Sequence, residues 1–288
     1  MMDELDSVRG TACRQEFARA HYVDNVPYPL HVAIKAGSIA EADLLIDQGV
    51  PLDVKDEHGH TSLHLAIRYG HLDIVDILLK YKAPLDMKDR EDNTPLHLAI
   101  KYGYMGIVEL LLMHNAPPDA KDREDNTPLH LVIRRGAYTS IVELLLMHNA
   151  PPDAKGREGN TPLHLAIESG YMDIVEILLK YNAPFNVENE RGDTPIHLAA
   201  RRRNVDLIKR MIEQDALFNE DRAHQLLNEV RGGIERLRVM EIICKRLGKA
   251  RQNPIMSAVD TQSYDDTHTY RDMKAHLPKA KQRTCWIS

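Results

Sequence analysis

Six of the 15 histidines recur at one spacing, and this row is the first candidate for chemistry in the sequence. Metal binding is the chemistry it suggests, because neutral imidazole is a common zinc ligand. Successive histidines are 33 or 34 residues apart, so stacked helical units would hold them about 10 Å from one another. Zinc needs its donors within about 2.3 Å of one point, so we expect structural histidines and no metal. The six are His31, His64, His97, His130, His164 and His197.

The remaining reactive residues form no catalytic pattern. His58 and His60 are close in sequence, but we expect an isolated, solvated pair rather than ligands. The three cysteines have no histidine arranged beside them, and neither a G-x-S-x-G turn nor a phosphate-binding glycine loop is present. Acid pairs such as Glu91-Asp92 fall in polar turns, where carboxyl pKa values stay ordinary. We therefore expect no enzyme and no cofactor.

Cys285 belongs to a short motif formed by the last four residues of the sequence. The last four residues, Cys-Trp-Ile-Ser, fit the C-a-a-X pattern of prenylation, and a final Ser favours farnesyl transfer. Four cations precede the motif and no acid follows Asp272; the cations are Lys274, Lys279, Lys281 and Arg283. One lipid chain gives marginal attachment, which cations strengthen on an anionic leaflet. The hypothesis is a farnesyl group on Cys285 and an anionic membrane as a partner of the tail.

Composition limits the function classes. Apolar residues make up 43% of the chain, enough for a core, and three scattered cysteines favour a reducing compartment. Residues 221–288 carry 13 Lys and Arg against 8 Asp and Glu, a balance of +5, so the other 220 residues carry 24 against 35, or −11. The start resembles no secretory signal, and no apolar run reaches about 18 residues. The expected location is cytoplasmic.

The elements that position these residues come from an internal repeat. Segments of the type TPLHLAIKYG begin at Tyr28, Thr61, Thr94, Thr127, Thr161 and Thr194, with spacings of 33, 33, 33, 34 and 33 residues. In the third copy, Thr94 and Pro95 are typical of a helix start, and Gly103 of its end. A second helix follows over 107–112, with Asn115 as its end, and the polar stretch 119–126 is predicted to be a hairpin.

This pattern resembles the ankyrin repeat, whose T-P-L-H motif recurs every 33 residues. The resemblance implies an all-α ankyrin-repeat solenoid of helix-turn-helix-hairpin units, in which the motif histidine bonds neighbouring repeats. We predict an N-terminal flank or cap over 1–27, with a short helix at 12–23, and six repeats over 28–220. Residues 221–252 are predicted to be a helical cap or a degenerate seventh repeat, and 253–288 a flexible basic tail.

Three positions depart from the family pattern. The glycine expected at the hairpin tip is Asp92 and Asp125 in two copies, and Arg203 replaces the glycine that ends the first helix. The two Asp residues should tolerate the left-handed backbone conformation less well than glycine, at some local cost. The last repeat, which contains Arg203, also has a polar second helix that suits a terminal cap with one face in water.

The resemblance also implies a binding face, because ankyrin partners usually contact the hairpin tips and the exposed side of the first helices. The position four residues after the motif histidine is cationic in five of six copies, Glu168 being the exception, and the next position holds two tyrosines. We predict a partner with an acidic surface; mixed charges at the hairpin tips make nucleic acid unlikely. The predicted binding residues are Lys35, Arg68, Tyr69, Lys101, Tyr102, Arg134, Arg135 and Arg201.

The leading functional interpretation is a non-catalytic adaptor, farnesylated and held at a cytoplasmic membrane face. One alternative is a soluble ankyrin regulator that masks a transcription factor or an enzyme, with the Cys-Trp-Ile-Ser ending a coincidence. Another is a pathogen effector that acts in a host cytosol. A phosphatase-targeting subunit is disfavoured, because its R/K-V-x-F docking motif is absent.

Overall fold

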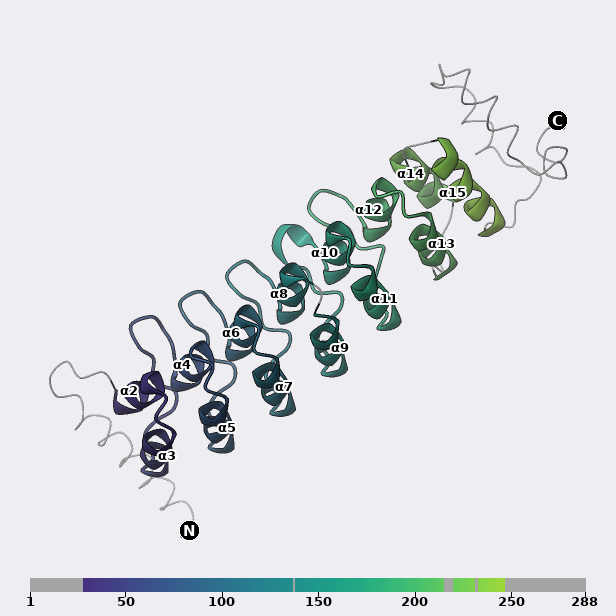
Figure 1. Ribbon diagram of the computed structural model, residues 1–288. Coiled ribbons are helices and arrows are strands. Elements are labelled where there is room, and N and C mark those ends of the chain that lie inside the picture. The colour runs from purple at the N-terminus through teal and green to yellow at the C-terminus, as the bar shows by residue number, and fades with distance from the viewer. Residues whose placement is uncertain (1–27, 137, 215–219, 231–232, 247–288) are drawn as a thin grey trace, which may run out of the picture. The chain divides into compact units, whose positions relative to one another are not determined.

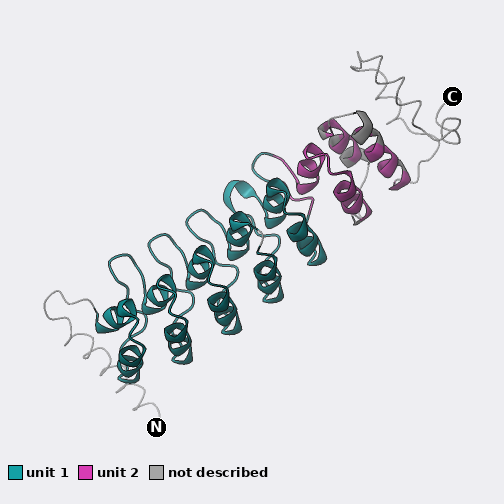
Figure 2. Ribbon diagram, viewed as in Figure 1, with its two compact units in different colours: residues 1–184, 189–191 teal, residues 185–188, 192–288 magenta. Residues whose placement is uncertain are grey.

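The computed structural model describes residues 28–136, 138–214, 220–230 and 233–246 (Figure 1). Every regular element in these ranges is helical, so the all-α fold is confirmed. The chain forms two compact units, which divide at the hairpin before the sixth repeat (Figure 2). The N-terminal flank, Cys285 and the basic tail lie outside the described residues.

The first unit contains five helical hairpins, one for each of the first five repeats. The first helices of these repeats are α2 (Pro29–Ala36), α4 (Ser62–Arg68), α6 (Pro95–Tyr102), α8 (Pro128–Arg135) and α10 (Pro162–Ser169). The second helices are α3 (Ile39–Asp47), α5 (Leu72–Lys80), α7 (Met105–Met113), α9 (Thr139–Met147) and α11 (Met172–Lys180). Each helix packs on its partner and on the same helix of the next repeat, so two parallel rows form (Figure 1).

The start of each first helix follows the sequence prediction. In the third repeat, Pro95 is the first helical residue, and Thr94 forms a reciprocal capping box with His97. Gly103 ends the helix in the left-handed conformation with φ 76°. Leu96, Ala99 and Ile100 are buried in the core between the two rows. Local signals alone therefore fix both ends of this helix.

The three family departures adopt the conformation that glycine would. Asp92 and Asp125 have φ of 60° and 62°, which confirms the left-handed prediction, and Arg203 has a φ of 57°. The extra residue of the fourth repeat lies in the stretch 137–143 of the sequence. Gly136, which ends α8 just before this stretch, has a ψ of 134°, whereas Gly37, Gly103 and Gly170 have ψ of 21°, 24° and 17°.

The bases of the hairpins are joined by lysines. Lys55 Nζ donates to the carbonyl of Lys88 at 2.7 Å, Lys88 Nζ to that of Lys121 at 2.7 Å, and Lys121 Nζ to that of Lys155 at 2.9 Å. Three equivalent lysine side chains thus bond four successive hairpins, each to the next. In the sixth repeat this position is Glu188, which carries no donor on its side chain.

The second unit contains α12 (Pro195–Arg201), α13 (Val205–Gln214), α14 (Glu220–Glu229) and α15 (Gly233–Arg246). The helix α12 packs on α13 and α14, and α15 packs on α13 and α14. The contacts of α12 with α14 and of α13 with α15 are thus like those between corresponding helices of neighbouring repeats in the first unit. The domain boundaries, including a seventh repeat over 221–252, stay a prediction.

Two glycines three residues apart provide a test of these backbone conformations. Gly103 has φ 76° and open space around an added Cβ, so Gly103→Ala should cost about 1 kcal/mol from backbone strain alone. Gly106 lies in α7 with the same open space and no positive φ, so Gly106→Ala should gain about 0.5–1 kcal/mol. Urea unfolding followed by circular dichroism measures both; the same sign for both would contradict the assigned conformations.

Candidate partner-binding face

The predicted cations of the first unit lie at the C-terminal ends of the first helices. Lys35, Arg68, Lys101 and Arg134 are exposed on α2, α4, α6 and α8, which pack side by side in that order. The row is interrupted at α10, where Glu168 occupies the position. The structure thus brings four of the predicted residues into one cation row, whereas Arg201 belongs to the second unit.

Two members of the cation row have acidic partners on the hairpin of their own repeat. Lys101 Nζ lies 2.8 Å from Glu91 Oε2, and Arg134 Nη1 lies 3.4 Å from Glu124 Oε2. The expectation of an ordinary pKa is wrong for Glu91, because the hydrogen bond from Lys101 lowers it, and the same bond raises the pKa of Lys101. Sequence reasoning missed these pairs, although the shared spacing of ten residues was a visible signal.

Arg201 makes the corresponding contact in the second unit, in a two-pronged geometry. Its two terminal nitrogens donate to the two carboxylate oxygens of Asp193 at 2.6 and 2.7 Å. A bidentate pair of this kind is stronger and more directional than a single lysine contact. Arg201 is therefore already engaged, and it is the least available of the predicted binding cations.

The hairpin tips pair with one another as well. Arg157 Nη1 lies 3.2 Å from Glu124 Oε2, and Arg191 Nη2 lies 2.7 Å from Glu158 Oε2. These residues remain between 43% and 66% exposed, so each pair contributes about 0–1 kcal/mol. A partner carboxylate can replace such a pair at little cost. The face presents alternating charges that are already paired in water, rather than a continuous cationic track.

Three of the predicted binding cations have no acidic partner in the described structure. Among the described residues, Lys35, Arg68 and Arg135 have no acidic group within salt-bridge distance. Tyr69 beside Arg68 is 46% exposed, and its ring stacks on that of His71 with centroids 6.0 Å apart. Tyr102 is 39% exposed. Exposed tyrosine and arginine side chains are the types that most often carry binding energy at protein interfaces.

The motif histidines serve the packing between repeats. His64 Nδ1 lies 2.8 Å from Thr61 Oγ1 and accepts the backbone N–H of Thr61 at 3.2 Å. Its Nε2 lies 3.2 Å from the carbonyl oxygen of Asn93 in the next repeat. A carbonyl only accepts, so these contacts assign the proton to Nε2. His97 and His130 repeat the arrangement, with Nε2 3.2 and 3.0 Å from the carbonyls of Asn126 and Asn160.

Burial sets the charge of these histidines. It lowers the pKa of His64 and of His130 to about 4, although the carbonyls that they face act in the opposite direction. It also lowers the pKa of His31 and His97. No group of three His, Cys, Asp or Glu suited to a metal ion occurs among the described residues.

The expectation that His58 and His60 form a solvated pair was wrong for His60. His58 is exposed, but His60 is only 7% exposed, with Nδ1 3.4 Å from Asp56 Oδ2. The reason is its place before the helix-capping Thr61, where other repeats bury Asn93 and Asn126. Asp56 accepts the backbone N–H groups of His58 and His60, which fixes this turn. His60 is thus part of the hairpin base.

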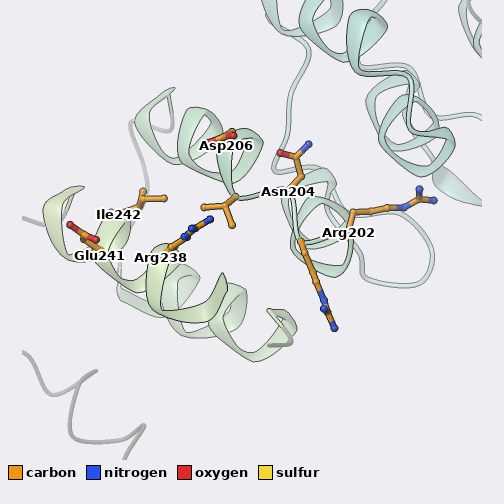
Figure 3. Close-up of a pocket in the computed structure, with 8 residues that line it drawn as sticks. Arg202, Asn204, Asp206, Arg238, Glu241 and Ile242 are labelled. Atoms are coloured by element: carbon orange, nitrogen blue, oxygen red, sulfur yellow. The ribbon is translucent and has the colours of Figure 1, made fainter. Parts of the chain in front are cut away.

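A pocket of about 690 Å³ lies in the second unit, beside the turn from α12 to α13 and against α15 (Figure 3). Its lining is largely polar and carries charges of both signs, unlike the apolar lining that is typical of small-molecule sites. The lining residues are Arg202, Arg203, Asn204, Val205, Asp206, Arg238, Glu241 and Ile242. None of these was among the predicted site residues.

Comparison with known proteins agrees with this architecture. The family model for ankyrin repeats (three copies) matches residues 12–89, 30–122, 96–189 and 130–222. The chain is similar to the crystal structure of the ankyrin repeat domain of Bcl-3, a unique member of the IkappaB protein family. The identity is 26% and the TM-score 0.65, over 76% of this chain and 99% of that chain. A search among curated proteins finds no match.

Ankyrin repeats are protein-interaction modules, and no enzyme family is indicated by these similarities. Within the described ranges, no helix has the length and apolar character needed to cross a bilayer.

Proposed function

Because the chain belongs to the ankyrin-repeat family, we propose that it is a non-catalytic adaptor whose first unit captures a protein with an acidic surface. The observation that carries this proposal is the cation row on α2, α4, α6 and α8. Arg68, with Tyr69 beside it, provides a cation and an exposed ring. Lys101 and Arg134 release Glu91 and Glu124 in exchange for partner carboxylates, a replacement that costs little at exposed positions.

Charge reversal on α6 and α8 tests the binding face. Lys101→Glu with Arg134→Glu should weaken the partner at least about tenfold, or 1.4 kcal/mol, because each new carboxylate repels the acidic partner. The partner is first recovered with the full chain and identified by mass spectrometry, and affinities are then measured at low and high salt.

A matched control reverses two cations on the second helices. Lys80 and Lys180 are 65% and 67% exposed and are also paired with carboxylates, those of Asp76 and Glu143. Lys80→Glu with Lys180→Glu changes the net charge equally but leaves the first helices intact. Equal weakening by both double variants would show that only net charge matters, and an unaffected affinity in the first would reject the binding face.

We further propose that Cys285 is farnesylated and that the tail attaches the adaptor to a cytoplasmic membrane face. The support is the Cys-Trp-Ile-Ser motif with Lys274, Lys279, Lys281 and Arg283 before it. Each juxtamembrane cation adds about 1 kcal/mol on an anionic leaflet, which complements the marginal attachment of a single lipid.

Cys285→Ser isolates this second proposal. The unaltered protein, expressed in a eukaryotic cytosol, should gain the mass of a farnesyl group and sediment with membranes, whereas the variant should stay in the supernatant. Replacing Lys279, Lys281 and Arg283 by Gln should give partial sedimentation, because the lipid stays and its electrostatic support is lost. An unmodified Cys285 with Trp286 still attached in the recovered protein would reject farnesylation.

A second candidate function is that of a soluble regulator that masks a transcription factor or an enzyme. The similarity to the ankyrin domain of Bcl-3, an IkappaB family member, favours this alternative. Cell fractionation separates the two proposals: the adaptor is expected in the membrane pellet, and the regulator in the soluble cytosol or nucleus. A pathogen effector acting in a host cytosol is compatible with either distribution.

A further inference from the structure

The outer faces of the two middle repeats differ from those of their neighbours. In α5 and α11, the second helical residue is Asp73 or Asp173 and the last is Lys80 or Lys180. The helices α7 and α9 carry uncharged residues at both positions: Gly106 and Ser140 at the second, Met113 and Met147 at the last. All four helices have nine residues, but the two middle ones, α7 and α9, lack the acidic residue at the second position and the lysine at the last position.

The result is an apolar surface with charged neighbours on both sides. Met113 and Met147 are 67% and 66% exposed, the largest exposed fractions of any large apolar side chain among the described residues. Leu110 and Leu144, one turn earlier on the same faces, are half-buried. We call these four residues the methionine patch. The helices α7 and α9 pack side by side in the second-helix row, so the four residues lie on adjacent helices (Figure 1).

An acidic row crosses the methionine patch. The fifth residue of each second helix from α5 to α11 is acidic: Asp76, Glu109, Glu143 and Glu176. Lys80 lies 2.6 Å from Asp76, and Lys180 lies 3.0 Å from Glu143, so neighbouring lysines compensate these two. Glu109 is exposed, and no cation in the described ranges lies within salt-bridge distance of it.

The methionine patch and the acidic row together indicate which kind of segment could bind this surface. Methionine is enriched at interfaces because its flexible side chain adapts to many apolar surfaces. A second copy of the same face would place acidic row against acidic row, which like-charge repulsion disfavours. The patch therefore fits a segment with apolar side chains and several cations, and without acids.

The chain itself contains such a segment. Of the 42 residues that follow Arg246, the last sixteen, 273–288, hold four cations and no acid, together with Leu277, Trp286 and Ile287. We propose that residues 273–288 dock on the methionine patch, with Trp286 or Ile287 against Met113 and Met147 and a cation opposite Glu109. Docking within one chain and docking between two copies use the same contacts, and they differ in their dependence on protein concentration.

Docking would have a regulatory consequence, which rests on the proposed function. A segment held on the patch withholds Cys285 from a prenyltransferase and withholds its cations from a membrane. Partner capture on the first helices is on the opposite row, so it remains possible while the segment is docked.

Trp286 is the sole tryptophan of the chain, so its fluorescence reports docking without a label. The full chain is produced in bacteria, which lack a protein farnesyltransferase, and the isolated peptide 273–288 gives the emission of a fully solvated indole. The full chain should emit at shorter wavelength and be less accessible to acrylamide than the peptide. High salt should move both values toward those of the peptide.

Met113→Lys with Met147→Lys tests the patch and preserves the fold, because Lys80 and Lys180 occupy the same positions in neighbouring repeats. Emission and quenching should shift to the peptide values. The matched control, Leu72→Lys with Met172→Lys, adds the same charge at exposed apolar positions outside the patch and should leave both values unchanged. Replacing Lys279, Lys281 and Arg283 by Gln leaves the repeats intact and should shift them as the patch variant does.

Two outcomes would overturn the inference. Emission equal to that of the peptide in the unaltered chain would mean that the segment does not dock. Protected emission that both methionine substitutions leave unchanged would mean that it docks elsewhere. Neither result depends on farnesylation, since the bacterial protein carries no lipid, so failure here is distinct from failure of the membrane proposal.

Discussion

Acidification from pH 6.5 to pH 4 is expected to remove about 3 kcal/mol of unfolding free energy for each of His64 and His130. Burial lowers the pKa of both to about 4 in the folded chain, from an ordinary value of 6.5. Between pH 6.5 and pH 4, these two histidines therefore bind more protons in the unfolded state than in the folded state. Stability is fully present above pH 6.5 and falls as the pH approaches 4, the sign expected for a group that must stay neutral to fold.

The geometry explains why protonation is costly. Nδ1 of His64 accepts the N–H of Thr61, and a proton on that nitrogen would turn the contact into two opposed donors. His31 and His97, whose pKa values are also lowered, add to the loss. Carboxylates contribute at lower pH: burial would raise the pKa of Asp56, but the N–H groups of His60 and His58 hold it below the ordinary 3.8.

Urea midpoints measured at intervals between pH 7.5 and pH 4.5 check this prediction above the range in which Asp56 titrates. His130→Gln supplies the control, because an amide offers an acceptor and a donor but does not titrate. That variant should be less stable at neutral pH and should lose less stability on acidification. A midpoint that stays constant from pH 6.5 to pH 4.5 in the unaltered chain would show that the motif histidines are not held neutral.

Periodicity explains which parts of this fold could be predicted from sequence. Thr94, Pro95 and Gly103 act on the backbone within a few residues of themselves, so the ends of α6 follow from local rules. The same signals recur at the same positions of the other copies, which supports the assignment of the first helix in every repeat. Left-handed Asp92 and Arg203 were predictable for the same reason, since alignment with glycine in other copies reveals the required φ.

The features that sequence reasoning missed are contacts between different elements of the fold. The pairing of Lys101 with Glu91 joins a hairpin to a helix, and the lysine bonds from Lys55 and Lys88 join successive hairpins. His60 was misassigned because its burial depends on the hairpin base rather than on its own residue type. The cation row stays a predicted binding site, and the pairing of Lys101 and Arg134 with Glu91 and Glu124 became visible only in the fold.

The exposure of Met113 and Met147 could not be predicted from the apolar pattern of their helices. In sequence, the ends of α7 and α9 look like a continuation of the core stripe, because Leu111 and Leu112 precede Met113 directly. Helical geometry places Leu111 and Leu112 inside and Met113 outside, with exposed fractions of 0%, 1% and 67%. Only comparison with Lys80 and Lys180 at the same helical position would have separated them.

Leu111→Ala is expected to destabilise the first unit by about 2–5 kcal/mol, because the side chain is fully buried and its removal leaves a cavity as well as losing apolar contact. Leu111 lies in α7, which packs on α6 and on the second helices α5 and α9. A cavity there weakens two inter-repeat interfaces at once. In a stack where each repeat contacts only its neighbours, such a loss in a central repeat should broaden or split the unfolding transition.

The choice of control for Leu111→Ala follows from the structure. Asp122 on the following hairpin is unsuitable, because its Oδ1 accepts the N–H groups of Glu124 and Asn126 at 2.9 and 2.8 Å and its loss would disturb that hairpin. Met113→Ala is the better match, since it removes a large apolar side chain from the same helix at 67% exposure. It should change stability by less than about 0.5 kcal/mol. Urea unfolding followed by circular dichroism compares the two variants, and equal losses for both would mean that the buried and exposed faces of α7 are wrongly assigned.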